Sequence, residues 1–152
     1  MNSDVIFTRS IAAASFIGQR IGNCTVSLDA ALYRFNNPTL ALAVSDAARR
    51  GVSIRLLVDQ KKHDEDSKTQ QLLRSGGFRF RLLNGRQGKG SKMHHKFAIL
   101  DGLTVLTGSY NWTLESEEEN YENLVILRDP NQVEAYRREF ELLWEEAGSV
   151  GA

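Results

Sequence analysis

A histidine and a lysine separated by one residue lie in the stretch KMHHKFAILDGLTVLTGSYNW, residues 92–112 of this 152-residue chain. Because side chains alternate along a β-strand, His94 and Lys96 are predicted to project to one side and His95 to the other. An imidazole is a nucleophile and a proton donor near neutral pH, and a neighbouring lysine favours an anionic substrate. A phosphate ester meets both requirements. His95 is expected to have a supporting role, such as that of a hydrogen-bonded residue beneath the sheet.

Groups that suit phosphoryl oxygens follow in the same stretch and shortly after it. Ser109 and Asn111 are again two residues apart, so an extended segment would present their hydroxyl and amide groups on one side. Glu122, at the start of a further apolar run, could accept a proton from the far nitrogen of an imidazole and fix its tautomer. Together with His94 and Lys96, these side chains form the predicted catalytic set.

The elements that must position this set follow an alternating pattern of strands and helices. Apolar and β-branched runs predict strands at residues 5–8, 25–33, 52–59, 78–83 and 123–128, and a hairpin of residues 94–108 that turns at Asp101-Gly102. Capping residues and apolar stripes predict helices at residues 10–21, 37–51, 68–74 and 129–148, the last beginning at Asp129-Pro130 and ending at Gly148. This order indicates a single α/β domain, residues 1–148, with a mixed sheet, helices on both faces and a short tail at residues 149–152.

Composition agrees with one compact domain, because 152 residues with 41% hydrophobic content can bury a proper core. No apolar run near the start is long enough to span a bilayer, and Asp4 and Arg9 interrupt a signal-peptide pattern. We therefore expect a soluble, cytoplasmic protein. Cys24 is the only cysteine, which excludes an internal disulfide and a thiolate zinc cage. A small buried residue at a strand entrance is the better interpretation of Cys24.

The net charge is zero, but the charges are segregated along the chain. Residues 67–100 contain eight basic and no acidic residues, whereas residues 101–146 contain twelve acidic and three basic residues. Such segregation favours a polyanionic partner, unless the charges interleave on folding. The glycine-rich segment LLNGRQGKGSK, residues 82–92, is predicted to be a mobile loop at the mouth of the site, where Arg86, Lys89 and Lys92 bind substrate.

Three further features have two interpretations each. Trp112 could stack on a base, but a core position is favoured. The acidic segment ESEEEN, residues 115–120, could bind a cation, but a solvated loop is favoured. The acidic residues from Asp59 to Asp66 could hold magnesium, but a strand end followed by a helix-capping turn explains them better.

The spacing H-x-K-x4-D-x6-G-S-x-N, which runs from His94 to Asn111, resembles the signature of the phospholipase D superfamily, with Asp101 and Gly108 at its structural positions. The order of elements around it is similar to that of the small single-motif members, the bacterial Nuc endonuclease and the Zucchini or mitochondrial cardiolipin hydrolase group. The chain contains neither the membrane segment nor the cysteine/histidine zinc insert of the animal Zucchini proteins. This difference favours a Nuc-like nuclease.

The resemblance implies a reaction with two motifs, in which one histidine attacks phosphorus to form a phosphohistidine and the other protonates the leaving oxygen. This chain has one motif, and its remaining histidine, His63, is expected on the solvated surface. A homodimer that places two His94 side chains across a two-fold axis is therefore expected. Paired Lys96 residues would neutralise the phosphate without a metal ion or other cofactor.

The expected function is a metal-independent phosphodiesterase that acts on nucleic acid, with single-stranded DNA or RNA favoured over duplex. A phospholipid hydrolase with the same mechanism is one alternative, although no membrane-anchoring segment supports it. A catalytically silent scaffold with this fold is another, and the intact motif disfavours it.

Overall fold

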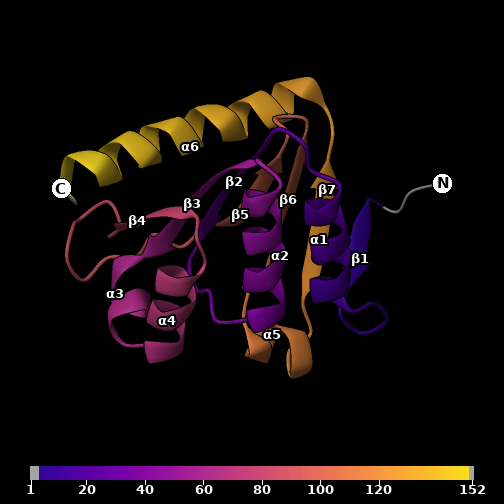
Figure 1. Ribbon diagram of the computed structural model, residues 1–152, viewed down its shortest axis with the longest axis horizontal. Coiled ribbons are helices and arrows are strands. Elements are labelled where there is room, and N and C mark those ends of the chain that lie inside the picture. The colour runs from indigo at the N-terminus through magenta and orange to yellow at the C-terminus, as the bar shows by residue number, and fades with distance from the viewer. Residues whose placement is uncertain (1–3, 151–152) are drawn as a thin grey trace.

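The computed structural model describes residues 4–150, with side chains up to Gly148, and places them in a seven-stranded mixed sheet with the strand order β1-β7-β6-β5-β2-β3-β4 (Figure 1). The strands are β1 Val5–Phe7, β2 Ser27–Leu32, β3 Ser53–Asp59, β4 Arg79–Leu83, β5 Lys96–Leu100, β6 Thr104–Gly108 and β7 Asn123–Leu127. The helices are α1 Ala13–Gly22, α2 Pro38–Arg49, α3 Gln60–Asp64, α4 Ser67–Ser75, α5 Leu114–Glu118 and α6 Pro130–Val150. Among the described helices, none combines the length and the apolar character that a bilayer span requires.

The direction of the strands brings distant segments of the chain to one edge of the sheet. Strands β2, β3 and β4 are parallel, whereas β5, β6, β7 and β1 continue the sheet with antiparallel pairing. The ends of β2, β3, β4 and β6 therefore lie at the same edge as the starts of β5 and β7. We call this the carboxyl edge. Every residue of the predicted motif except Asp101 lies at this edge, either at a strand end or in the adjoining connection.

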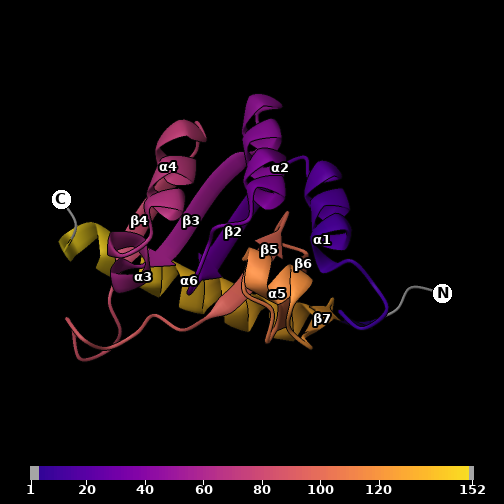
Figure 2. The same cartoon turned by 90° about the horizontal axis from the view of Figure 1, so that it is seen from below.

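Helices cover both faces of the sheet, as the sequence predicted. Helices α1, α2 and α4 pack on one face (Figure 2), where residues such as Ile17, Leu40 and Leu73 are fully or almost fully buried. Helix α6 lies across the other face (Figure 1) and buries Phe140 and Trp144 against the sheet. Strand alternation sets this division, because odd and even positions of each buried strand face opposite helix layers.

Local sequence signals explain where two of the helices begin. In α2, Asn37 is the N-cap whose side chain accepts a hydrogen bond from the Thr39 N–H at 2.9 Å, and Pro38 is the first helical residue. In α6, the Asp129 carboxylate accepts a hydrogen bond from the Gln132 N–H at 3.1 Å. Both N-termini confirm the predictions from sequence.

The predicted end of the last helix at Gly148 is wrong. Helix α6 continues through Gly148 to Val150, and residues 151–152 of the predicted tail lie outside the described part of the chain. The Arg81 guanidinium donates a hydrogen bond to the Trp144 carbonyl at 2.7 Å, and a Cβ atom at position 148 would collide with it. The glycine therefore accommodates an arginine from β4, and it does not mark a helix end.

The hairpin of β5 and β6 turns at Asp101-Gly102, as predicted. Asp101 and Gly102 have φ angles of 55° and 67°, and the Leu103 N–H donates to the Leu100 carbonyl at 3.0 Å. The Asp101 carboxylate also accepts hydrogen bonds from the backbone N–H groups of Val26 and Ser27 at 2.8 and 3.0 Å. It therefore ties the hairpin to the start of β2, at the edge opposite to Lys96.

Two short helices were not predicted, and one of them replaces the expected acidic loop. Helix α5 occupies most of the ESEEEN segment, and its glutamates have partners that are distant in sequence. The Glu117 carboxylate accepts hydrogen bonds from the Tyr110 hydroxyl and from the Ala14 N–H, both at 2.8 Å. Glu115 forms an ion pair with Arg34 at 2.7 Å. These tertiary contacts order a segment whose composition alone indicated a solvated loop.

Candidate active site at the carboxyl edge

His94 and Lys96 contact each other at the carboxyl edge. His94 lies in the segment that leads into β5, and Lys96 is the first residue of that strand. The Lys96 Nζ lies 3.3 Å from Nδ1 and 3.5 Å from Nε2 of the His94 ring, and it donates a hydrogen bond to the His94 carbonyl at 2.9 Å. The exposed imidazole and the half-buried ammonium group thus form one cluster, in agreement with the prediction that the two project together.

Tyr33 forms the floor of this cluster. Its ring centre lies 4.4 Å from that of His94, and the Lys96 Nζ lies 5.2 Å from the Tyr33 ring centre. A third cation, the Nζ of Lys62, lies 5.6 Å from the same ring centre. Tyr33 follows β2 and Lys62 follows β3, so the parallel pairing of these strands delivers both to the site. The sequence analysis missed both residues, although the position of Tyr33 at the end of one predicted strand and of Lys62 shortly after another was a usable signal.

Asp59, at the end of β3, anchors the segment that carries His94. It is 1% exposed, its Oδ1 accepts a hydrogen bond from the Met93 N–H at 2.9 Å, and its Oδ2 accepts one from the Lys62 N–H at 3.1 Å. The capping interpretation of the acidic cluster is therefore right for Asp59. In addition, one buried carboxylate connects α3 to the residue that precedes His94.

Replacing Asp59 with alanine should destabilise the protein and misplace His94. The buried Met93 N–H and the partly buried Lys62 N–H would lose their acceptor, and an unsatisfied buried donor costs about 1–3 kcal/mol. Denaturant unfolding should therefore show a clearly lower free energy of unfolding, and phosphodiester turnover should fall at temperatures where the variant remains folded. Asp64→Ala is the matched control, because the exposed Asp64 carboxylate accepts only side-chain bonds from Gln60 and His63. Wild-type stability and turnover in Asp59→Ala would contradict the anchoring role.

Ser109 and Glu122 are directly bonded to each other at this edge. The Ser109 hydroxyl donates to Glu122 Oε1 at 2.6 Å and accepts a hydrogen bond from the Asn123 N–H at 3.1 Å. The Ser116 hydroxyl donates to Glu122 Oε2 at 2.9 Å. The Ser109 hydroxyl therefore has Glu122 as its partner in this structure, and its contact with a phosphoryl oxygen stays a prediction.

Glu122 does not orient His94 within one chain. Among the described residues, no hydrogen bond joins the two side chains, and the Glu122 oxygens accept bonds from two serines and from the Asn120 amide at 3.1 Å. Burial lowers the pKa of Lys96, and the negative charge of Glu122 partly opposes this effect. The tautomer-fixing contact between Glu122 and an imidazole stays a prediction.

Asn111 and Gly108 have roles set by the packing of the motif. The Asn111 N–H donates to the Ser116 hydroxyl at 3.2 Å, while its side-chain oxygen is buried and has no hydrogen-bond partner. Gly108 has a φ of 154°, and a Cβ atom there would collide with the carbonyl oxygen of Asn123. Only glycine lets β6 approach β7 closely enough to join Ser109 to the Glu122 segment.

His95 points to the opposite side from His94, but it is not buried beneath the sheet. Its exposed ring packs edge-on against Phe97 with ring centres 5.2 Å apart, and it lines a groove beside Tyr136 of α6. Among the described residues, no hydrogen bond of its ring was found. The direction predicted by alternation is right, whereas the hydrogen-bonded supporting role is wrong because α6 leaves this end of the strand uncovered.

The surrounding charges favour a neutral His94. Partial burial, followed by the positive charges of Lys96 and Lys92, lowers the pKa of His94 below its ordinary value. Burial also lowers the pKa of Lys96. A neutral imidazole retains the lone pair that a nucleophile needs, so the arrangement suits attack on an anionic centre that the lysines attract.

The basic loop between β4 and β5 runs across the carboxyl edge (Figure 2) and is folded by its own hydrogen bonds. The Gly85 N–H donates to the Ser91 carbonyl, and the Ser91 N–H donates to the Gly88 carbonyl, both at 3.0 Å. The exposed side chains of this loop include the three predicted substrate-binding residues, Arg86, Lys89 and Lys92. The positive charge of Lys92 acts on the site, since it contributes to the lowered pKa of His94.

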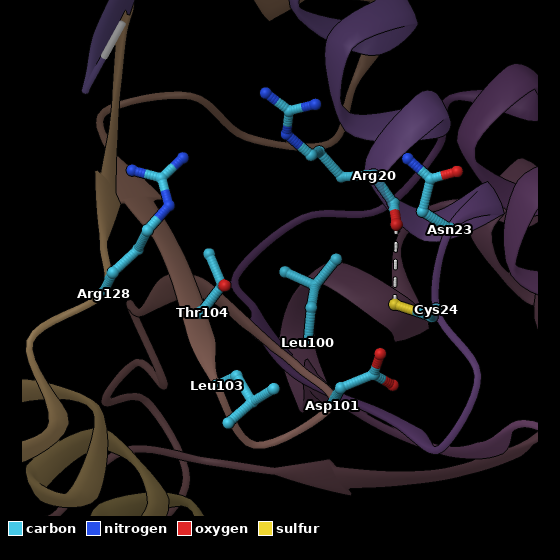
Figure 3. Close-up of a pocket in the computed structure, with 8 residues that line it drawn as sticks. All are labelled: Arg20, Asn23, Cys24, Leu100, Asp101, Leu103, Thr104 and Arg128. Carbon is cyan, nitrogen blue, oxygen red and sulfur yellow. Dashed lines mark hydrogen bonds between the residues drawn. The ribbon is translucent and has the colours of Figure 1, made fainter. Parts of the chain in front are cut away.

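A pocket of about 230 Å³ at the opposite edge of the sheet is not the site of this chemistry (Figure 3). The motif contributes only Asp101 to it, and the Asp101 carboxylate is bonded to backbone N–H groups. The Cys24 thiol in its wall donates to the Arg20 carbonyl at 3.5 Å, and burial raises the pKa of Cys24 to about 11. Cys24 is therefore the buried, protonated residue that the sequence indicated.

The structure also shows the positions of Trp112 and His63. Trp112 is 3% exposed and packs against Phe35 with ring centres 6.4 Å apart, which confirms a core position. His63 lies in α3, where its Nδ1 is 2.9 Å from the Asp64 carboxylate, so it is a half-buried partner of that residue and not a freely solvated one. Neither residue belongs to the His94 cluster.

Comparison with known proteins identifies the family. Residues 17–144 match the family described as "Cardiolipin synthase, PLD-like domain". The chain belongs to this phospholipase D-like family. The resemblance drawn from the motif is thereby confirmed, and the fold agrees with it.

Relatives of this phospholipase D-like chain fall into two groups. It is 40% identical over 120 residues to the mitochondrial cardiolipin hydrolase of Xenopus laevis, covering 79% of this chain and 55% of that protein. The corresponding Homo sapiens protein is 37% identical, with 79% and 46% covered, so the chain spans about half the length of these curated relatives.

Two solved structures share the fold at 24% identity. NucT from Helicobacter pylori has a TM-score of 0.83, with 93% of this chain and 94% of that chain covered. Nuc from Salmonella typhimurium has a TM-score of 0.82, with 93% and 92% covered.

Proposed function

We propose that this phospholipase D-like chain is a metal-independent phosphodiesterase that cleaves nucleic acid through a phosphohistidine intermediate. The observation that carries the proposal is the contact between the exposed His94 imidazole and the Lys96 ammonium group, 3.3 Å apart at the carboxyl edge. A nucleophile with a lowered pKa lies beside a fixed cation. This combination serves phosphate transfer better than it serves any neutral substrate.

The reaction needs two imidazoles. A His94 nitrogen attacks phosphorus, the bond from phosphorus to the leaving oxygen breaks, and a second imidazole donates its proton to that oxygen. Water then attacks the phosphohistidine, the second imidazole accepts a proton from the water, and the phosphorus–nitrogen bond breaks to release His94. Lys96 stabilises the charge on the non-bridging oxygens throughout.

The second imidazole is proposed to be His94 of another copy of the chain. Of the three histidines in the sequence, His95 packs against Phe97 and His63 is paired with Asp64. A two-fold axis at the carboxyl edge would bring two His94–Lys96 pairs to one phosphate. The pair of lysines would then supply the positive charge that other phosphodiesterases obtain from a divalent cation.

Two substrate classes fit this chemistry. The exposed cations of the basic loop, Arg86, Lys89 and Lys92, extend from the site along the carboxyl edge and favour a linear polyanion such as single-stranded DNA or RNA. The names of the relatives that are 32–40% identical, mitochondrial cardiolipin hydrolases, favour a phospholipid phosphodiester as the second candidate. The mechanism at His94 would be the same in both.

Cleavage of nucleic acid should persist in excess chelator. The purified chain is incubated with labelled single-stranded DNA, RNA, duplex DNA and cardiolipin vesicles, each with and without chelator. We expect single-stranded nucleic acid to be cleaved fastest, with rates unchanged by chelator and reduced by vanadate, which mimics a five-coordinate phosphorus. Turnover of cardiolipin alone would favour the lipid candidate. A strict requirement for magnesium or zinc would reject the mechanism.

A further inference from the structure

Lys62 places a positive charge beside Tyr33, the ring that also contacts His94 and Lys96, and the mechanism above does not use it. The ammonium groups of Lys62 and Lys96 lie 5.6 and 5.2 Å from the centre of one aromatic ring, that of Tyr33. Aromatic faces attract cations, so this ring holds both groups at the carboxyl edge. The same ring contacts His94.

The position of Lys62 relative to His94 is built into the fold. The Lys62 N–H and the Met93 N–H are bonded to the two oxygens of the buried Asp59 carboxylate, at 3.1 and 2.9 Å. The Lys62 side chain itself is 29% exposed, so its ammonium group is accessible to a ligand. A fixed backbone and an accessible charge are what a binding residue requires.

The present partner of Lys62 is easily displaced. Its Nζ donates to Glu65 Oε1 at 2.8 Å, and the Glu65 side chain is 46% exposed. Ion pairs between solvent-exposed side chains contribute little to stability. A backbone phosphodiester, held close by its covalent link to a bound neighbour, can therefore replace this carboxylate.

We propose that Lys62 binds a second phosphate of the substrate, adjacent to the phosphate that Lys96 holds for cleavage. This inference rests on the proposed nuclease function. Charges along one strand of DNA repeat about every 3.4 Å of helix axis, so a bound strand offers further phosphates near the scissile one. An isolated phosphodiester offers none. Lys62 therefore gives the site a preference for a chain of phosphodiesters over a single one.

The test compares a polyanion with an isolated diester. Lys62→Ala should raise KM for a fluorescent single-stranded oligodeoxynucleotide about tenfold, equivalent to one charged hydrogen bond, with kcat nearly unchanged. It should leave kcat/KM for bis(p-nitrophenyl) phosphate unchanged. Lys62→Arg should retain most of the affinity because it keeps the charge. Arg74→Ala is the control for loss of a positive charge, since Arg74 is exposed in the last turn of α4, just before β4 starts at the opposite edge of the sheet.

A second variant tests the competition with Glu65. Glu65→Gln removes the carboxylate that occupies Lys62, so it should tighten oligonucleotide binding several-fold, and this gain should vanish in the Lys62→Ala background. Equal losses on both substrates in Lys62→Ala, or the same loss in Arg74→Ala, would overturn the proposal. Binding is also measured by fluorescence anisotropy in His94→Ala protein. If the wild-type protein fails to cleave nucleic acid, the nuclease function is rejected, and the anisotropy comparison still decides whether Lys62 binds phosphate.

Discussion

Replacing His94 with alanine should abolish phosphodiester turnover, with a loss of about 1,000-fold or more. The residue is exposed, so the variant should fold, but it lacks the proposed nucleophile. Initial rates on fluorescent single-stranded DNA measure the loss, and thermal unfolding checks the fold. In the wild-type protein, the rate should decline as the pH falls below the pKa of His94, because protonation removes the attacking lone pair, and it should also decline at high pH, because the second imidazole then loses the proton that it donates. Burial and the positive charges of Lys96 and Lys92 shift the decline at low pH below the ordinary pKa of histidine.

His95→Ala provides the matched control for this prediction. His95 is equally exposed but packs against Phe97 on the other side of the strand, so turnover should remain close to wild type. Exposed substitutions of this kind change stability by no more than about 0.5 kcal/mol. A well-folded His95→Ala protein without activity, together with an active His94→Ala protein, would reverse the assignment of the two histidines.

A heterodimer of one wild-type and one His94→Ala subunit should be inactive, whereas independent sites would leave it half-active. The proposed site lies on a two-fold axis and uses one His94 to attack and the other to protonate the leaving oxygen. Removing either imidazole therefore removes the whole reaction. The two histidines are chemically identical, so they can take different roles only if one is protonated and the other is neutral. The bound phosphate must therefore keep one proton on the pair, and the pair then titrates as a unit.

Differently tagged subunits, purified as the mixed species, provide the measurement. The mixed dimer should lose activity to the same extent as the dimer in which both subunits carry His94→Ala. An inhibitory oxyanion should bind to the wild-type protein at one per two chains. Sedimentation establishes whether the purified chain is a dimer at the assay concentration. An active monomer, or one anion site per chain, would refute the shared site.

The fold was predictable from sequence wherever the signal is local. The Asn37-Pro38 start of α2 and the Asp101-Gly102 turn depend on backbone preferences of the residues themselves, and both were placed correctly. Helix α5 was missed because its order depends on contacts with Ala14, Arg34 and Tyr110, which no local pattern reveals. Gly148 was misread because a glycine can serve close packing as well as helix termination.

Within the candidate site, only the pair of His94 and Lys96 was predictable from the sequence. The two-residue step from His94 to Lys96 is a property of one segment, and the structure preserves it. Asp59, Tyr33 and Lys62 come from two other segments that the strand order brings to the carboxyl edge, so their contacts with the His94 segment depend on topology. Ser109 was assigned to the substrate because its spacing suited that role, but its hydroxyl proton is bonded to Glu122, a residue on a neighbouring strand.

The most direct test of the central claim is to trap and locate the covalent intermediate. Wild-type protein is mixed with a 5′-labelled oligonucleotide, quenched at alkaline pH, where phosphohistidine survives, and mapped by mass spectrometry after proteolysis. The account predicts a nucleotidyl adduct on His94, formed and lost at rates that match turnover and unaffected by chelator. An active enzyme whose adduct lies on another residue, or which forms none under any quench, would contradict it.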